Sequence, residues 1–136
     1  MNHIGVATPD LDASIAFYRD VMGATDITEP FVLESQQVRV CFVNTPGENG
    51  TAGTQVELLQ PTTPDSAVGK WLEKNPLGGQ HHICYEVPDI HAAKAWFEGQ
   101  DLRLGFAPGN PGVSTANSPL IGICQKHCGI CRMRLY

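Results

Sequence analysis

The sequence predicts an α+β fold assembled from two copies of one module, in which a strand leads into a helix and then into further strands. Three observations indicate this. Residues 81–90 repeat residues 2–11. Each copy changes from strand periodicity to helix periodicity at the same point. The chain has 136 residues, 42% hydrophobic and 17% charged, which suits one globular domain.

The repeat joins "NHIGVATPDL" at the start of the chain to "HHICYEVPDI" 79 positions later. The two stretches align without a gap. Four pairs of matching residues carry the alignment: His3 with His82, Ile4 with Ile83, Pro9 with Pro88 and Asp10 with Asp89. A repeat of this kind means that one supersecondary unit occurs twice.

The first copy begins with alternation over residues 3–7, which places His3, Gly5 and Ala7 on one face of a strand. A helix is predicted next, because apolar residues recur at steps of four, three and four over 11–22. Asp10 is placed to cap this helix, and Gly23 is placed to end it.

Three more strands are predicted in "EPFVLES", "VRVCFVN" and "TQVELLQP", the last two joined by the glycine-rich loop "TPGENGTAG". We therefore divide a single domain, residues 1–136, into three parts. The first module is 1–60, a connecting helix lies in 64–76, and the second module is 80–136.

The second copy starts like the first, with a helix stripe of Ile90, Ala93 and Phe97 that stops at Gly99. It becomes atypical after about residue 100. Residues 102–136 contain no Asp or Glu and show little periodicity, and only "PLIGIC" is typical of a strand. The hypothesis that residues 100–136 come from a shifted reading frame would explain this change.

Charge and hydropathy exclude several classes of function. The net charge of −5 gives no electrostatic case for nucleic acid or an anionic membrane. No apolar run approaches the roughly 20 residues of a transmembrane helix. Met1 is followed at once by a predicted strand, so we expect no leader and a cytoplasmic location. The odd count of five cysteines argues against a disulfide framework.

His3, Glu57 and His82 are the candidate metal ligands. Equivalent strands of a duplicated module face each other, so His3 and His82 can point into one shared cleft. Alternation puts Glu57 on the face of its strand that also carries Gln55 and Leu59. Two imidazoles and a carboxylate suit a divalent ion, and Co, Mn, Ni, Zn and Fe are not distinguished.

Other polar residues of the repeat are assigned different roles. His81 points to the face opposite His82 and is interpreted as a packing or supporting residue. His91 falls in the first turn of a helix and is expected in solvent. Glu86 shares the face of His82 but lies about 13 Å along the strand, too far for the same ion.

The stretches "NHIGVATPDLDASIAFYRDVMGA", "TQVELLQP", "SAVGKWLEKNPLGG" and "HHICYEVPDI" together resemble methylmalonyl-CoA epimerase, a family of the vicinal oxygen chelate (glyoxalase and bleomycin-resistance) superfamily. The resemblance covers residues 1 to about 98. It implies paired β-α-β-β-β modules that form a curved mixed sheet around a metal cleft. By position, His3, Glu57 and His82 match three of the family's four metal ligands.

The fourth ligand of the family, a glutamate on the last strand, is not found. Glu57 follows His3 by 54 positions, and the same step from His82 leads to Tyr136. The residues just before it include no carboxylate, and arginine cannot replace a metal ligand. We therefore expect the activity of this chain to be impaired.

The resemblance implies an isomerase with an acyl-CoA substrate. Proton removal and return at C2 of methylmalonyl-CoA would pass through an enolate whose charge the metal spreads. The catalytic acid and base are not assigned, and the sequence leaves open whether the chain forms a homodimer. Three alternatives stay open: an extradiol dioxygenase, a lactoylglutathione lyase type of enzyme, and a non-catalytic binding protein of the bleomycin-resistance kind.

The tail contains a second set of potential metal ligands in "CQKHCGIC", with Cys124, His127, Cys128 and Cys131. Thiolates and imidazole are suitable zinc ligands. Four ligands within eight residues would strain a single tetrahedral site, however, so this reading is a minor alternative.

Overall fold

A computed structural model of the chain describes residues 1–99, 103–107, 110–114 and 120–125. The chain forms two compact units, one of residues 3–81 and one of residues 1–2 with 82–136. The boundary falls inside strand β6 (Gly79–Val87), between His81 and His82. The chain is α+β, as predicted, and none of its described helices is long and apolar enough to cross a membrane.

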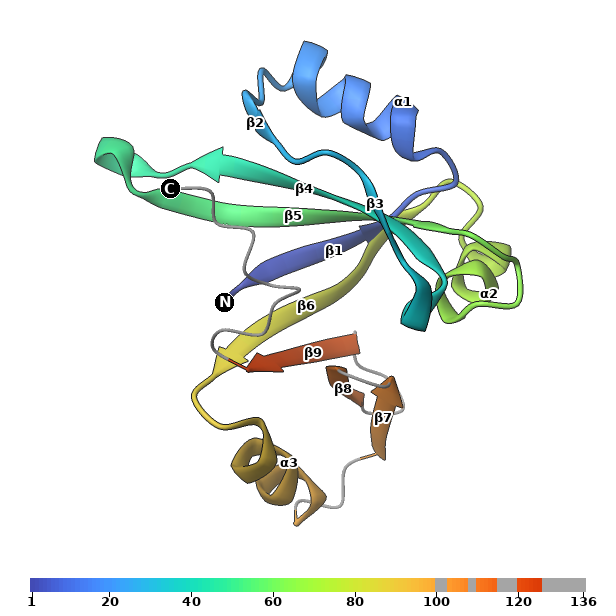
Figure 1. Cartoon of the computed structure of the whole chain (residues 1–136), viewed down its shortest axis with the longest axis vertical. Coiled ribbons are helices and arrows are strands. Elements are labelled where there is room, and N and C mark those ends of the chain that lie inside the picture. Colours follow the sequence, from blue (N-terminus) through green and yellow to red (C-terminus); the bar gives the residue numbers. More distant parts are fainter. Residues whose placement is uncertain (100–102, 108–109, 115–119, 126–136) are drawn as a thin grey trace. The chain divides into compact units, whose positions relative to one another are not determined.

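The unit of residues 3–81 is built on a mixed sheet in the order β2-β4-β5-β1, with β3 paired to β4 (Figure 1). Its strands are β1 (His3–Ala7), β2 (Asp26–Ile27), β3 (Phe31–Leu33), β4 (Val38–Pro46) and β5 (Ala52–Pro61). β1 and β5 run parallel, whereas β4 is antiparallel to β5. β1, β3, β4 and β5 lie at the stretches predicted to be strands, whereas β2, only two residues long, was not predicted.

The helices of this unit also begin where the sequence indicates. They are α1 (Leu11–Ala16), continued by the π-helical turn η1 (Phe17–Val21), and α2 (Ala67–Lys74), with short 3-10 turns η2 (Glu34–Gln36) and η3 (Glu48–Gly50). The Asp10 carboxylate accepts a hydrogen bond from the Ala13 N–H at 2.9 Å. The Ser66 hydroxyl accepts one from the Gly69 N–H at 3.0 Å. Both are N-caps, which satisfy donors that the first turn leaves unpaired.

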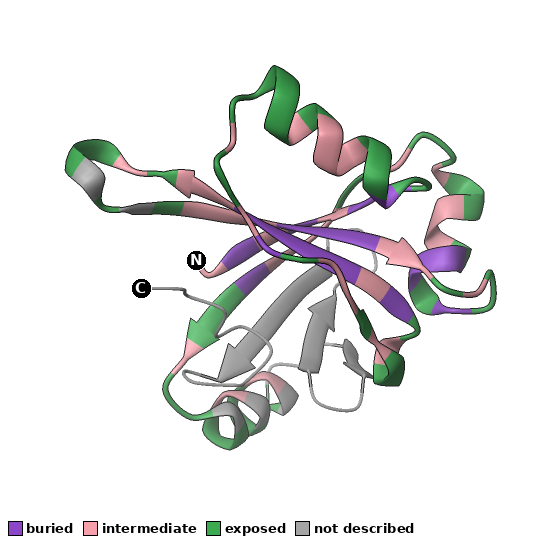
Figure 2. Ribbon diagram, turned by 45° about the horizontal axis from the view of Figure 1, so that its top comes forward, coloured by how far each residue is buried: buried purple, intermediate pink, exposed green. Residues whose placement is uncertain are grey.

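Alternation along the strands divides the core of this unit between the two faces of the sheet. On one face Cys41, Val43 and Leu58 pack with Leu11 of α1. On the other, a cluster of Ala7, Val38, Val40, Phe42, Leu59 and Val68 packs with Phe31, Leu33, Trp71 and Leu72. Figure 2 shows that most of the buried positions of this unit lie in its central strands. The second face is the one that carries His3 and Glu57, as expected from the odd-numbered positions of β1 and β5.

The second unit repeats this connectivity. β6 pairs in parallel with β9 (Leu120–Gln125), which pairs antiparallel with β8 (Asn110–Ser114), and β8 pairs with β7 (Arg103–Ala107). Helix α3 (Ile90–Glu98) follows β6. Asp89 caps it, and the backbone N–H groups of Ala92 and His91 that donate to this carboxylate lower its pKa. β9 matches the predicted strand "PLIGIC", whereas β7 and β8 were missed because Gly, Pro and Asn interrupt their alternation.

Replacing Leu58 by Ala is expected to lower the free energy of unfolding by about 2–5 kcal/mol, because its fully buried side chain leaves a cavity between β5 and α1. Urea unfolding followed by circular dichroism measures the change. Leu77→Ala is the matched control, since Leu77 is 96% exposed and its removal should have little effect. Equal losses in the two variants would contradict the core assignment.

Candidate metal centre

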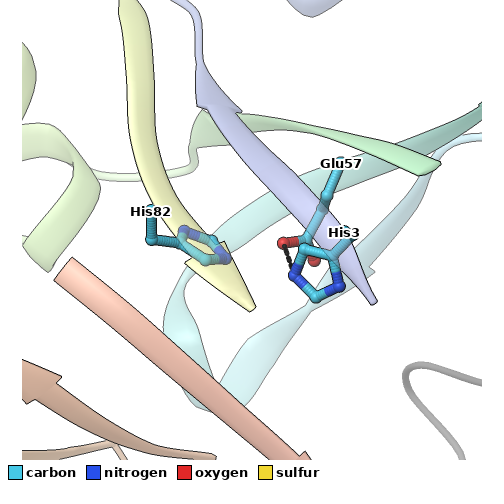
Figure 3. Close-up of side chains that lie close together, drawn as sticks. All are labelled: His3, Glu57 and His82. Atoms are coloured by element: carbon cyan, nitrogen blue, oxygen red, sulfur yellow. Dashed lines mark ion pairs between the residues drawn. The ribbon is translucent and has the colours of Figure 1, made fainter. Parts of the chain in front are cut away.

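His3 and Glu57 form a buried pair at the centre of the first unit. Their side chains come from neighbouring parallel strands, and the His3 Nε2 lies 3.1 Å from the Glu57 Oε2 (Figure 3). The two residues are only 3% and 7% exposed. In the β1–β5 register Glu57 is opposite Gly5 and His3 is opposite Gln55. The glycine leaves room above Glu57, so the imidazole and the carboxylate meet on a diagonal.

Aromatic side chains form an apolar wall beside this pair. Phe42, which is opposite Glu57 in β4, meets the His3 ring edge-on, with centroids 6.2 Å apart and planes at 71°. Phe31 lies against Phe42 at the same centroid distance. Such a wall lowers the local dielectric and strengthens the His3–Glu57 interaction. Phe42 was not singled out from the sequence, although alternation with Val38 and Val40 could have placed it on this face.

His81 and His82 follow a sharp turn at Gly78 and Gly79. Gly78 has φ +77°, and a Cβ there would come within 2.5 Å of the Ala7 carbonyl oxygen, so only glycine fits. The His81 ring meets Trp71 of α2 edge-on, with centroids 5.5 Å apart. This contact confirms the interpretation of His81 as a packing residue. His82, which belongs to the second unit, is half-buried on β6.

Asn2 and β6 are joined within the second unit. The Asn2 N–H donates to the Cys84 carbonyl at 2.8 Å, and the Asn2 amide donates to the exposed Glu86 carboxylate at 3.2 Å. Glu86 is therefore engaged with Asn2, in keeping with its exclusion as a ligand. The bond also ties the residue before His3 to the strand that carries His82.

The strand registers identify the counterpart of Glu57 in the second module. Glu57 is opposite Gly5, two residues after His3. The equivalent position in β9 is Gly122, which is opposite Cys84, two residues after His82. The step of 54 positions from His3 to Glu57 does not carry over to these strand pairs, because the chain between the paired strands is 14 residues shorter in the second module. Glycine has no side chain to offer a metal.

The sequence also drew attention to His91, to single cysteines and to a motif in the tail. His91 is exposed in the first turn of α3, as expected. Cys41 and Cys84 are buried, and burial raises the pKa of the Cys41 thiol. The motif "CQKHCGIC" falls outside the described residues except for Cys124 and Gln125, which end β9.

A buried imidazole beside a buried carboxylate is the kind of donor set that binds first-row divalent metals. Burying the Glu57 carboxylate beside an apolar wall costs free energy unless the carboxylate has a partner. His3 is such a partner when no ion is bound. The residues present therefore fit a divalent ion.

Comparison with known proteins gives consistent results. Residues 2–117 match the sequence profile of the Glyoxalase/Bleomycin resistance protein/Dioxygenase superfamily. An ethylmalonyl-CoA/methylmalonyl-CoA epimerase of Cereibacter sphaeroides is 36% identical over 135 residues, which is 99% of this chain and 95% of that protein. A mitochondrial methylmalonyl-CoA epimerase of Dictyostelium discoideum is 39% identical over 126 residues, 93% of this chain and 70% of that protein.

Solved structures agree with the sequence relatives. A methylmalonyl-CoA epimerase in complex with methylmalonyl-CoA and NH4+ superposes with a TM-score of 0.79 at 31% identity, covering 93% of both chains. A Streptomyces coelicolor methylmalonyl-CoA epimerase bound to 2-nitronate-propionyl-CoA gives a TM-score of 0.78 at 31% identity, covering 93% of this chain and 96% of that one.

In metal-free protein, His3 and Glu57 should depend on each other for stability. We expect His3→Ala and Glu57→Leu each to lower the free energy of unfolding by about 1–3 kcal/mol, because each leaves a buried polar group without this partner. The double variant should lose less than the two single losses combined, with a coupling of about 0.5–3 kcal/mol. Urea unfolding in the presence of a chelator measures this, and strictly additive losses would contradict the pairing.

Proposed function

Since the chain belongs to the methylmalonyl-CoA epimerases of the glyoxalase/bleomycin resistance protein/dioxygenase superfamily, we propose that it acts at C2 of methylmalonyl-CoA. The reaction removes the C2 proton and returns one to the opposite face. The observation that carries this proposal is the buried His3–Glu57 pair, because it puts metal-binding side chains inside a fold shared with these enzymes.

The ligands proposed for the divalent ion are His3, Glu57 and His82. Each offers a side-chain atom that can bind a metal, and His3 and Glu57 already lie side by side in the first unit (Figure 3). The internal repeat supports the same set, since His82 is the counterpart of His3. When bound, the ion would stabilise the negative charge that develops on the thioester oxygen as the C2 proton leaves.

The side chains of the first unit have two further tasks in this reaction. Glu57 would balance part of the positive charge of the ion, and its burial keeps that interaction strong. Phe42 and Phe31 would exclude water from one side of the imidazole and hold the ring in place. Both effects favour charge development at a water-poor centre rather than in bulk solvent.

The proposed centre has one protein ligand fewer than its relatives are expected to have, because Gly122 occupies the register position that matches Glu57. The missing carboxylate would have balanced charge on the ion and could have moved a substrate proton. Losing either role would weaken stabilisation of the transition state. Each increase of about 1.4 kcal/mol in the activation free energy lowers the rate tenfold. We therefore propose that turnover by this chain is impaired.

Metal binding should distinguish the two adjacent histidines. His82→Ala is expected to abolish tight binding of a divalent ion, whereas His81→Ala should retain it, because His81 packs on Trp71. Mass spectrometry of protein purified without chelator, together with a Co²⁺ titration, measures occupancy and affinity. If the two folded variants lose metal equally, the ligand assignment is wrong.

Exchange of the C2 proton for deuterium, followed by NMR with methylmalonyl-CoA, should be very slow in the unmodified chain. Gly122→Glu should bind Co²⁺ at least tenfold more tightly and raise the exchange rate, because it returns a carboxylate to the counterpart of Glu57. Ile121→Glu adds the same charge one register position away and is the control.

The outcomes separate the competing functions. Rapid exchange by the unmodified chain would show that the carboxylate is dispensable and would refute the proposed impairment. Absence of exchange in a folded, metal-loaded Gly122→Glu variant, and in a chimera with a relative's residues in place of 100–136, would count against the epimerase function. Binding of methylmalonyl-CoA without exchange in any variant would favour a non-catalytic binding protein.

A further inference from the structure

Two amide side chains lie on the same face of the sheet as His3 and Glu57, towards the hairpin between β4 and β5. The Gln55 Nε2 donates a hydrogen bond to the Asn44 Oδ1 at 2.6 Å, and both residues are half-buried. They are directly opposite each other in the β4–β5 register. Gln55 is also opposite His3 in the β1–β5 register. The amide pair therefore adjoins the proposed metal centre on its own face.

The position of the pair marks a change in the chemistry of this face. On β4 the face is apolar and buried through Val38, Val40 and Phe42, and it becomes polar at Asn44. Just beyond, the Thr45 hydroxyl donates to the Thr54 carbonyl across the same two strands. The amide pair therefore lies on regularly paired strands, at the point where the buried apolar part of this face ends and half-buried polar residues begin.

The pair combines donors and acceptors in one place. Each amide has one carbonyl oxygen and two N–H groups, and the bond between them uses one N–H of Gln55 and the carbonyl of Asn44. The second N–H and the carbonyl of Gln55, with the NH2 of Asn44, lie outside that bond. A donor and an acceptor side by side are complementary to a secondary amide, which needs one of each.

An acyl-CoA carries such an amide close to its thioester. Four covalent bonds separate the thioester carbonyl carbon from the first amide nitrogen of the pantetheine arm, a span of about 5–6 Å. Two residues along a strand, the step from Glu57 to Gln55, cover about 6.6 Å. A thioester held at Glu57 and His3 would therefore bring its first pantetheine amide to Gln55.

We propose that the Asn44–Gln55 amide pair binds the pantetheine amide nearest the thioester and so sets the preference for thioesters of CoA. This inference rests on the proposed function, because it takes the thioester to lie at His3 and Glu57. Gln55 acts here as a specificity-determining residue, with Asn44 holding its side chain in position.

The test compares methylmalonyl-pantetheine with methylmalonyl ethyl thioester, which has the same acyl group and no amide. Dissociation constants are measured by NMR titration of the metal-loaded chain. Gln55→Leu is expected to weaken binding of the pantetheine thioester by roughly tenfold and to leave binding of the ethyl thioester unchanged. Asn44→Leu, which removes the other half of the pair, should give the same selective loss.

Gln60→Leu is the matched control, because Gln60 lies on the same strand and donates to the Pro9 carbonyl instead of Asn44. It should leave both affinities unchanged. Equal losses for the two thioesters in Gln55→Leu would show that the pair contacts the acyl group and would overturn the inference. No loss for either thioester would also overturn it. If the unmodified chain binds neither thioester, the proposed function fails, and the inference fails with it.

Discussion

The parallel register of β1 and β5 is the constraint on which the proposed centre depends. It sets Glu57 opposite Gly5 and one diagonal step from His3, so an imidazole and a carboxylate meet at 3.1 Å in a buried position. A shift of one residue would send Glu57 to the face that packs on α1. Leu58 and Leu59 hold the register, because a slip of one residue would exchange the side chains that pack on the two faces of the sheet.

The two modules share their connectivity but differ in what they offer to a ligand. β1 pairs in parallel with β5 as β6 pairs with β9, and each parallel pair is extended by an antiparallel neighbour. At the matched position one module has Glu57 and the other has Gly122. A duplicated fold can therefore keep its backbone pairing while one copy loses a functional side chain, since strand pairing uses backbone groups alone.

On the face of the first sheet that carries the proposed centre, the side chains change from apolar to polar along the strands. Packing of Val40 and Leu59 dominates one end, the His3–Glu57 pair occupies the middle, and the amides of Asn44 and Gln55 stand nearest the hairpin. An apolar wall followed by a few convergent polar groups is the usual composition of a small-molecule site. The proposed acyl and pantetheine contacts follow this gradient.

The sequence by itself determined the module, the faces of its strands and the candidate ligands, because periods of 2 and 3.6 and an internal repeat are local or self-referential signals. His3, Glu57 and the packing role of His81 could be assigned in this way. Only the tertiary structure decided that Gly122 matches Glu57, that Phe42 walls the imidazole and that Gln55 pairs with Asn44. Each of these depends on which residues are opposite each other in paired strands. The lengths of the segments between paired strands set that register. These lengths differ between the two modules, and no periodic pattern in the sequence reports them.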